Sequence, residues 1–458
     1  MISLLSRSGN LLQNSSFESD LTFWQADNVT TVDTTAAEGT QAASLGPGVA
    51  SLFQDVVLGP LQRMPLFLSF IAYVAAGTPG DLVAEVLWLD ASGIVIGSGL
   101  RAFIPGTTLS AAHITFFDIT DRPPLGTQWA RLQFSKGTPS ISVLIDLVNL
   151  APVQTTNLIR NPSFERGLAE WSASGFDSGF TSVFEGAATA LQSTTPGTLS
   201  QEVLLAPVLP GSSYLLSFAA LSPVASTVTA QLFWLNIFGT IIGEPAINAP
   251  IVATTLSGQG AYMNFMQASE PAPIGAVRAR LVFTAASGTG STLNLDQVNL
   301  IRLTSPNLLE NPGFINGLEG WTTQGVTAQG TGGFVGENFA LLSSTGAVIN
   351  QTVTLPLGSA RDSFLLNFAL RFSGTEVTNG NVLAQVHWLN ILGEEIGLGL
   401  SLVVSQPLQT RAQWQVFTGF TERAPLNAFL ARIQFTKSAS GGAGADIGLD
   451  SVIFARVD

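Results

Sequence analysis

The chain has 458 residues, of which 46% are hydrophobic and only 11% are charged, and its net charge is −13. An intrinsically disordered chain needs high charge and low hydrophobicity, so this composition excludes one. The only lysines are Lys136 and Lys437, which leaves no basic surface of the kind that nucleic acids and anionic membranes require. The absence of cysteine excludes disulfides, thiolate metal sites and a cysteine nucleophile.

No apolar run approaches the ~20 residues of a membrane-spanning helix, so we do not expect membrane insertion. The start of the chain, Met1 to Gly9, is too short and too polar for a secretory signal. Either a signal has been removed or the protein reaches its site without one, and the Met1 start favours the second alternative. Residues 1–9 form an arm ahead of the first repeat. This arm is either a frayed terminus or an extended segment that pairs with the sheet edge of a neighbouring molecule.

A short motif occurs three times and divides the chain. Its second copy runs from Asn157 through Asn161-Pro162-Ser163-Phe164-Glu165 to Trp171, and the other copies begin at Asn10 and Asn307. The interval between copies is close to one domain length, which predicts three tandem domains, each with its own core. We expect repeat 1 at residues 10–153, repeat 2 at 157–303 and repeat 3 at 307–458. The linkers are so short that neighbouring domains should touch and form a semi-rigid series.

Within the first repeat, runs of strand length are rich in β-branched and aromatic residues and are separated by Gly, Pro, Asp and Ser turns. No long window shows the 3.6-residue apolar period of a helix. Many short strands at domain length predict an all-β fold of three tandem antiparallel β-sandwich or jelly-roll domains. The expected strands are Ser51–Leu58, Leu66–Tyr73, Leu82–Leu89, Ile114–Ile119, Trp129–Phe134 and Val143–Leu150.

Several side chains recur at equivalent positions of the three repeats. Aromatic residues that recur at one framework position are expected to fill the core. The recurring residues are Gln54, Gln201 and Gln351; Trp24, Trp171 and Trp321; Trp88, Trp234 and Trp388; Arg131, Arg280 and Arg432; and Asp146, Asp296 and Asp450.

The opening motif, Asn-Leu-x-x-Asn-Pro-x-Phe-Glu followed by Gly-Leu-x-x-Trp, resembles the start of the galactose-binding-like jelly rolls of carbohydrate-binding modules. The closing Leu-Asp-x-Val-x-Leu, from Leu295 to Leu300, strengthens the resemblance, which covers one module per repeat. It implies a jelly-roll fold but not a single function, because this sandwich also serves in adhesion and assembly. Similar tandem modules in bacterial spore-surface and appendage proteins imply an extracellular location or one on the cell or spore surface.

The resemblance also implies a structural calcium ion, held by the acidic residue after the first Phe and by the Asp of the last strand. Carried over to this chain, it pairs Glu18 with Asp146 and Glu165 with Asp296, whereas repeat 3 has Ile315 in place of the Glu. The alternative is that these aspartates hydrogen-bond the backbone of the first strand without a metal.

Few aromatic residues remain to hold a saccharide ring. Sugar sites of such modules expose Trp or Tyr faces, and most rings here are at framework positions. Trp129 aligns with Val277 and Phe429 in a strand, which indicates a core position. Trp414 and Tyr262 are the candidates for exposed contacts with a ligand.

No catalytic constellation stands out in the sequence. His113 and His387 occupy different repeat positions and neither has the spacing of a metal site or a triad. The pair Glu394-Glu395 could serve a glycosidase, but its position in a turn is typical of a solvated face. We therefore expect a protein that is not an enzyme.

Three functions remain, and two of them are favoured. The first is a structural surface protein that associates with itself into a fibre, coat or appendage, which is favoured by tandem rigid modules, low charge, a free arm and the scarcity of ligand aromatics. The second is a multivalent carbohydrate-binding or adhesion protein whose partners are cell-surface or extracellular glycans, with three weak sites gaining avidity. A phage tail or receptor-binding part is a third option.

Overall fold

The computed structural model describes residues 9–33, 36–61, 63–138, 141–193, 196–205, 211–222, 227–256, 261–286, 293–373, 381–404, 413–438 and 446–457. Of the predicted N-terminal arm, residues 1–8 lie outside this part of the chain, whereas the Gly9 N–H donates to the Thr421 carbonyl of repeat 3 at 2.9 Å. The described chain is almost entirely β-strand, which confirms the predicted all-β class. No helix in it is long and apolar enough to cross a bilayer.

The strands of each repeat follow the same order. Repeat 1 contains β1 (Glu18–Leu21), β2 (Gln25–Asp27), β3 (Val29–Val32), β4 (Ala42–Leu45), β5 (Ala50–Val57), the 3-10 helix η1 (Gly59–Leu61), β6 (Leu66–Tyr73), β7 (Leu82–Leu89), β8 (Val95–Ile104), β9 (Ile114–Ile119), β10 (Trp129–Lys136) and β11 (Val143–Pro152). The six predicted stretches correspond to β5, β6, β7, β9, β10 and β11, with differences only at their ends.

Repeat 2 contains β12 (Glu165–Leu168), β13 (Ser172–Ser174), β14 (Phe176–Gly179), β15 (Thr189–Gln192), β16 (Gly197–Leu204), β17 (Tyr214–Leu221), β18 (Thr227–Leu235), β19 (Ile241–Ile251), helix α1 (Ala253–Leu256), β20 (Met263–Ala268), β21 (Arg278–Ala286) and β22 (Asn294–Arg302). Repeat 3 contains β23 (Thr322–Gln324), β24 (Val326–Gln329), β25 (Phe339–Leu342), β26 (Val348–Thr354), β27 (Phe364–Ser373), β28 (Val382–Leu389), β29 (Glu395–Val404), β30 (Trp414–Phe420), β31 (Leu430–Lys437) and β32 (Asp446–Arg456).

Each repeat forms two five-stranded antiparallel sheets that pack face to face, as the sandwich prediction requires. We call one the outer sheet and the other the inner sheet. The outer sheets have the strand orders β2-β5-β10-β7-β8, β13-β16-β21-β18-β19 and β23-β26-β31-β28-β29. The inner sheets have the orders β3-β4-β11-β6-β9, β14-β15-β22-β17-β20 and β24-β25-β32-β27-β30.

The recurring residues form the frame of each sandwich. Gln54 accepts a hydrogen bond from the Gln13 N–H and donates one to the Gln13 carbonyl, at 2.8 and 3.0 Å, which ties the opening motif to the outer sheet. Gln201 and Gln351 make the same pair of bonds in their own repeats. The six recurring tryptophans are all buried, which confirms them as core residues.

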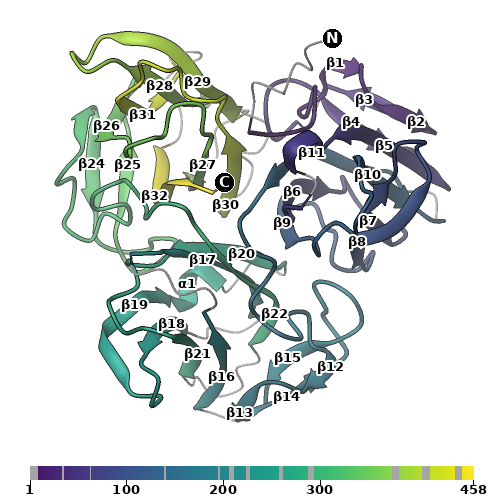
Figure 1. Cartoon of the computed structure of the whole chain (residues 1–458), viewed down its shortest axis with the longest axis horizontal. Helices are drawn as coiled ribbons and strands as arrows, with labels where there is room; N and C mark the ends of the chain where they lie inside the picture. The colour runs from purple at the N-terminus through teal and green to yellow at the C-terminus, as the bar shows by residue number, and fades with distance from the viewer. Residues whose placement is uncertain are drawn as a thin grey trace.

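The three repeats close into a ring. Figure 1 shows them around a common centre, with repeat 1 in purple and blue beside both repeat 2 in teal and repeat 3 in green and yellow. Asn149 of repeat 1 donates to the Thr418 carbonyl of repeat 3 at 3.0 Å, and Gln267 of repeat 2 donates to Ser451 of repeat 3 at 3.1 Å. Neighbouring domains touch, as expected, but repeats 1 and 3 touch as well, so the expected series of domains is closed on itself.

Ring closure buries the central strands of the inner sheets on both faces. All eight residues of β6 and all ten of β11 are buried, whereas β5 of the outer sheet alternates between buried and accessible residues. The residues of β6 that point away from the core of repeat 1 pack on the other repeats; the ring of Phe67 lies 5.7 Å from that of Phe420 in repeat 3. Only one broad sheet face per repeat therefore stays open to solvent.

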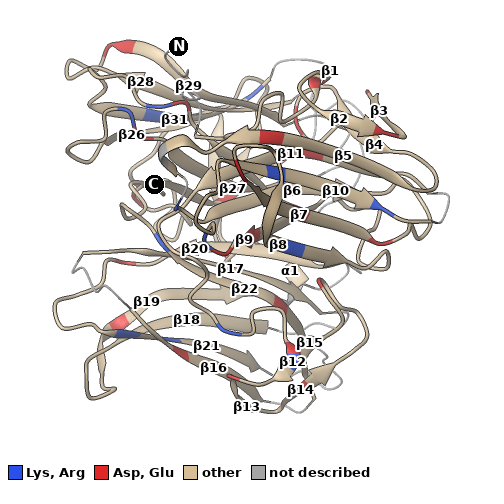
Figure 2. Cartoon of the chain, turned by 45° about the vertical axis from the view of Figure 1, so that its right-hand side comes forward, with Lys and Arg blue, Asp and Glu red and all other residues tan. Residues whose placement is uncertain are grey.

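The outer sheets carry the recurring arginines. Arg131 forms a two-pronged ion pair with Asp55 at 2.7 and 2.8 Å, and Arg280 and Arg432 pair with Glu202 and Glu395. Charged residues are otherwise sparse and scattered over the molecule, as Figure 2 shows. Exposed pairs of this kind contribute about 0–1 kcal/mol, so they add little to the stability of the ring.

Candidate functional site at the junctions between the repeats

Three equivalent loops, which we call plug loops, join the repeats. They comprise residues 36–39 of repeat 1, 183–186 of repeat 2 and 333–336 of repeat 3. Each plug loop enters the opening between the two sheets of the neighbouring repeat. Phe184 stacks on Phe116 of repeat 1 at 4.8 Å, and Phe334 stacks on Phe265 of repeat 2 at 4.7 Å. Ala37 occupies the equivalent place in the core of repeat 3.

Backbone hydrogen bonds fix each plug loop to the edge of the neighbouring outer sheet. The Gly186 N–H donates to the Phe103 carbonyl at 2.7 Å, the Gly336 N–H to Pro250 at 2.6 Å and the Gly39 N–H to Val403 at 2.8 Å. The strands β8, β19 and β29 lie at the edges of the outer sheets. Each plug loop therefore pairs with backbone carbonyls that would otherwise lack a partner within the sheet. The same contact thus occurs three times around the ring.

The recurring aspartates of the last strands hold the plug loops in place. Oδ2 of Asp296 accepts the N–H groups of Phe184 and Glu185 at 2.9 and 3.2 Å. Asp146 and Asp450 bind their own loops in the same way. Burial raises the pKa of Asp450 to about 8, although the three N–H groups that it accepts act in the opposite direction. The hydrogen-bonding alternative named the first strand as partner, and the structure places the plug loop there instead.

The glutamates of the opening motif support the same loops from the other side. Oε1 of Glu18 accepts the N–H groups of Thr40 and Gln41, both at 2.7 Å, and Glu165 accepts those of Ala187 and Ala188. Gly39 has a φ of 64°, and a Cβ there would lie 2.4 Å from the Glu18 carboxylate. Glycine is therefore required where the loop turns over the glutamate.

These carboxylates do not fit a calcium site. Glu18, Asp146, Glu165 and Asp296 all direct oxygens at backbone N–H groups, whose positive ends occupy the directions that a cation would take. Among the described residues, no three His, Asp or Glu side chains are grouped to hold a metal ion. In repeat 3, where Ile315 is 77% exposed, Asp450 holds its loop without a glutamate partner.

We therefore expect that adding a chelator in excess leaves the melting temperature of the protein unchanged. Hydrogen bonds between carboxylates and backbone N–H groups, and not a bound ion, position the plug loops in this account. Differential scanning fluorimetry with and without EDTA, followed by added CaCl2 as a control, measures this directly. A fall of several degrees that CaCl2 restores would contradict it, since an ion that binds only the native state stabilises it by mass action.

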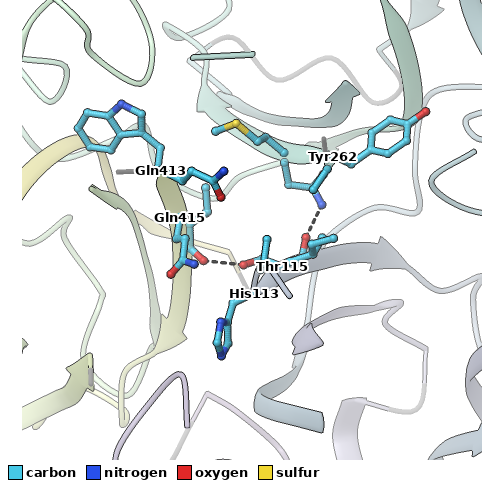
Figure 3. Close-up of a pocket in the computed structure, with 12 residues that line it drawn as sticks. His113, Thr115, Tyr262, Gln413 and Gln415 are labelled. Atoms are coloured by element: carbon cyan, nitrogen blue, oxygen red, sulfur yellow. Dashed lines mark hydrogen bonds between the residues drawn. The ribbon is translucent and has the colours of Figure 1, made fainter. Parts of the chain in front are cut away.

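A narrow cavity lies where the three inner sheets meet. Its volume is about 20 Å³, which is room for about one water molecule. It is lined by the equivalent segments 112–115, 261–264 and 413–416 (Figure 3). Thr115 donates to the Val416 carbonyl at 2.5 Å, and Asn264 donates to the Thr115 carbonyl. Val416 cannot donate in turn, so the cycle of hydrogen bonds around the centre stays open at repeat 3.

The two residues expected to contact a ligand are buried at this centre. Tyr262 and Trp414 are each only 5% exposed and are equivalent to one another, with His113 as the third member. The Tyr262 hydroxyl donates to the Ser182 carbonyl at 2.5 Å, and the Trp414 indole donates to Gly332 at 3.2 Å. Figure 3 shows Tyr262 and His113 pointing away from the cavity. Both candidates therefore brace the segments beside the plug loops and do not form an exposed sugar platform.

The junction of repeats 3 and 1 contains a groove of about 300 Å³, large enough for a small ligand. Repeat 1 contributes Ser15, Ser16 and the carboxylate of Glu38, and repeat 3 contributes Ser401 and Glu422, beside the apolar wall of residues 398–402. Glu38 is 7% exposed and its Oε1 accepts the Val403 N–H at 2.8 Å. Burial raises the pKa of its carboxyl above the usual value. The described lining residues include no Lys, Arg or His.

Longer side chains occupy the equivalent position at the other two junctions. The strand position that is Gly419 in repeat 3 is Asp118 in repeat 1 and Gln267 in repeat 2. Asp118 is hydrogen-bonded to Gln297, and Gln267 donates to Ser451, so each bridges its junction. A Cβ at Gly419 would come within 2.9 Å of Leu402 and so would point into the groove. Comparison of the three repeats aligns Gly419 with the polar residues Asp118 and Gln267. Only the structure shows that the glycine lines a groove.

The residues considered for catalysis, His113, His387, Glu394 and Glu395, do not line this groove. His387 contacts Glu395 at 2.9 Å on the outer sheet of repeat 3, and Arg432 binds the same carboxylate at 2.8 Å. The hydrogen bond from His387 lowers the pKa of Glu395, which suits a permanently ionised surface group and not a general acid. The ring of His113 stacks on Tyr73 at 4.2 Å. The absence of enzyme activity stays a prediction.

No protein-family model and no curated protein sequence matches the chain. Solved structures do resemble it. The tandem CBM22-1 and CBM22-2 domains of Xyn10C from Paenibacillus barcinonensis are 14% identical, with 65% of this chain and 99% of that one covered and a TM-score of 0.28. A CBM61 in complex with β-1,4-galactotriose is 18% identical, with 32% of this chain and 99% of that one covered and a TM-score of 0.27.

Other carbohydrate-binding modules, one of family 16 and one CBM4, are also among the similar structures, at 21% and 16% identity and TM-scores of 0.25 and 0.23. Another similar structure is the enzymatically active domain of a tailspike protein of bacteriophage CBA120, at 17% identity, with 31% of this chain and 21% of that one covered and a TM-score of 0.27. At such identities the chain's function has to be argued from its own groove and junctions.

Proposed function

We propose that the protein is a non-catalytic carbohydrate-binding protein whose ligand binds in the groove between repeats 3 and 1. The observation that carries the proposal is this groove, which stays open because Gly419 stands where Asp118 and Gln267 bridge the other junctions. The central strands of the inner sheets are unavailable because ring closure buries both of their faces. Carbohydrate binding is also one of the functions that the sequence resemblance allows.

The chemistry of the groove suits a neutral sugar. The carboxylates of Glu38 and Glu422 can accept hydrogen bonds from sugar hydroxyls, and the hydroxyls of Ser15, Ser16 and Ser401 can both donate and accept. Leu398, which is 46% exposed, offers an apolar wall for the C–H face of a ring. The two carboxylates would repel uronic acids, sialic acids and phosphosugars, because no cation of the described lining balances them.

Replacing Gly419 by Gln tests this site. The added side chain reproduces Gln267 at the equivalent junction and should fill the groove. Its Cβ would lie 2.9 Å from Leu402, so the flexible ends of Leu402 and Leu400 have to shift to admit it. On an array of neutral and acidic oligosaccharides, the wild-type protein is expected to retain neutral glycans. The Gly419→Gln variant should bind the retained glycan at least ~10-fold more weakly, which corresponds to about 1.4 kcal/mol.

The matched control is Ser92→Gln, which adds the same side chain to an exposed turn between β7 and β8. It should bind as the wild type does. Retention of no neutral glycan by the wild-type protein would reject carbohydrate binding. Equal binding by the wild type and Gly419→Gln would place the site elsewhere, for instance on an outer sheet.

Self-association remains the second candidate function, and the location on a cell or spore surface remains an expectation. The feature that favours self-association is the exposure of large apolar side chains on one hairpin turn of every repeat. Ile94 is 62% exposed, Phe238 is 89% exposed and Leu392 is 79% exposed. Exposed apolar groups on a weakly charged surface favour protein contacts. The proposal concerns one site and not three equivalent ones, because the position of Gly419 carries Asp118 and Gln267 in the other two repeats.

A further inference from the structure

The junction of repeats 3 and 1 differs from the others in how it is held. Repeats 1 and 2 are joined by the short linker between Pro152 and Asn157, and repeats 2 and 3 by the one between Arg302 and Asn307. Those two junctions therefore form between segments that the chain already holds together. Repeats 3 and 1 are joined by non-covalent contacts alone, so the ring can open there without breaking a covalent bond.

The same junction also lacks two contacts that the other junctions have. Its plug residue is Ala37, whereas the other plug loops insert Phe184 and Phe334 and bury a whole ring. An Ala buries far less apolar surface than a Phe, so this plug contributes less to its junction. Gly419 and Leu147 occupy the positions that hold the bridging pairs Asp118–Gln297 and Gln267–Ser451 at the other two junctions. The groove of about 300 Å³ removes further packing from this interface.

We propose that a second copy of this chain can take the place of repeat 1 at this junction, so that opened chains join head to tail. The occupant follows from the fold, because the plug loop of any copy presents the same Ala37, Glu38 and Gly39 to the same edge strand β29. A contact between two different surfaces closes into a ring when its rotation completes a circle, and otherwise it extends into a filament. Within one chain the linkers keep repeat 1 at a high effective concentration near repeat 3, which favours the closed ring in dilute solution. Chains therefore join to one another only when the protein is concentrated or crowded.

Two single-cysteine variants distinguish the closed ring from the joined chains. Glu38 and Val404 form an isolated antiparallel bridge across the junction, so cysteines at these positions are close enough for a disulfide. The chain has no cysteine of its own. Glu38→Cys and Val404→Cys proteins are mixed and oxidised over a range of concentrations, and cross-linked dimers are quantified on non-reducing gels. The expected result is a heterodimer whose yield rises in proportion to concentration.

The matched control uses Val335→Cys and Ile251→Cys, the equivalent pair at the junction of repeats 2 and 3, which is tethered and has the Phe334 plug. This mixture should give at least ~10-fold less heterodimer at equal concentration. Carrying Glu38→Cys and Val404→Cys in one chain should give a disulfide within the chain and abolish dimers, because the ring is then locked. Adding Ala37→Phe to the single-cysteine mixture should lower the yield by at least ~10-fold, about 1.4 kcal/mol.

A double-cysteine chain that cross-links fully within itself, together with a mixture that gives no heterodimer at any concentration, would overturn the proposal. Equal yields from the two junctions would overturn it too, since the junction of repeats 3 and 1 would then open no more readily than the tethered junction of repeats 2 and 3. The outcome is independent of sugar binding, so the proposed carbohydrate site can fail while this one stands, and the reverse.

Discussion

Replacing Phe184 by Ala is expected to lower the free energy of unfolding by about 3–5 kcal/mol, the usual cost of removing a fully buried Phe. Phe184 is completely buried, and it packs between Phe116 of repeat 1 at 4.8 Å and Tyr262 of its own repeat at 5.1 Å. The substitution therefore opens a cavity in the core of a neighbouring repeat. Chemical denaturation measures the loss.

The position of the damage separates this account from an ordinary core mutation. Hydrogen exchange should speed up in β9 (Ile114–Ile119) of repeat 1, although the substituted residue belongs to repeat 2. The matched control is Phe180→Ala, since Phe180 lies in the same repeat and is 73% exposed; its effect should stay within about 0.5 kcal/mol. Faster exchange confined to repeat 2, or a loss no larger than that of the control, would show that the plug loop does not stabilise its neighbour.

The strands could be predicted from the sequence because their side-chain patterns are strong. β5 and β7 alternate between buried and accessible residues, as half-buried strands do. The sequence of β6 contains a further signal, which indicates a strand covered on both faces. Leu66–Tyr73 is apolar at nearly every position, a pattern typical of a strand covered on both faces, and all eight residues are buried. Read in this way, the sequence indicates a layer beyond the sandwich, although not which part of the chain supplies it.

The candidate site was harder to predict because it depends on positions that differ among the repeats. Equivalence identified the framework residues, such as Asp146 and its counterparts, and left Tyr262 and Trp414 as spare rings. Their equivalence to each other and to His113 becomes visible once β20 and β30 are aligned with β9 through their pairing with β17, β27 and β6. No sequence pattern shows that Gly419 faces another repeat, since that contact exists only after the ring has closed.

Ring closure also changes what the resemblance to carbohydrate-binding modules implies. An isolated sandwich offers two sheet faces, but here one face of each repeat is consumed by the other two repeats. The junctions between repeats then hold both the groove that could bind a ligand and the contacts that stabilise the ring. A sugar in the groove would contact repeats 1 and 3 together, so its binding should favour the closed ring over the opened chain.

The radius of gyration in dilute solution tests the ring most directly. A compact chain of 458 residues has a radius of gyration of about 23 Å, whereas three domains of roughly 150 residues set end to end, one domain diameter apart, would reach about 35 Å. Small-angle X-ray scattering distinguishes these values easily, and a dilution series controls for association between chains. We predict about 23 Å at the lowest concentrations; a value near 35 Å there would contradict a ring in which repeat 1 contacts repeat 3.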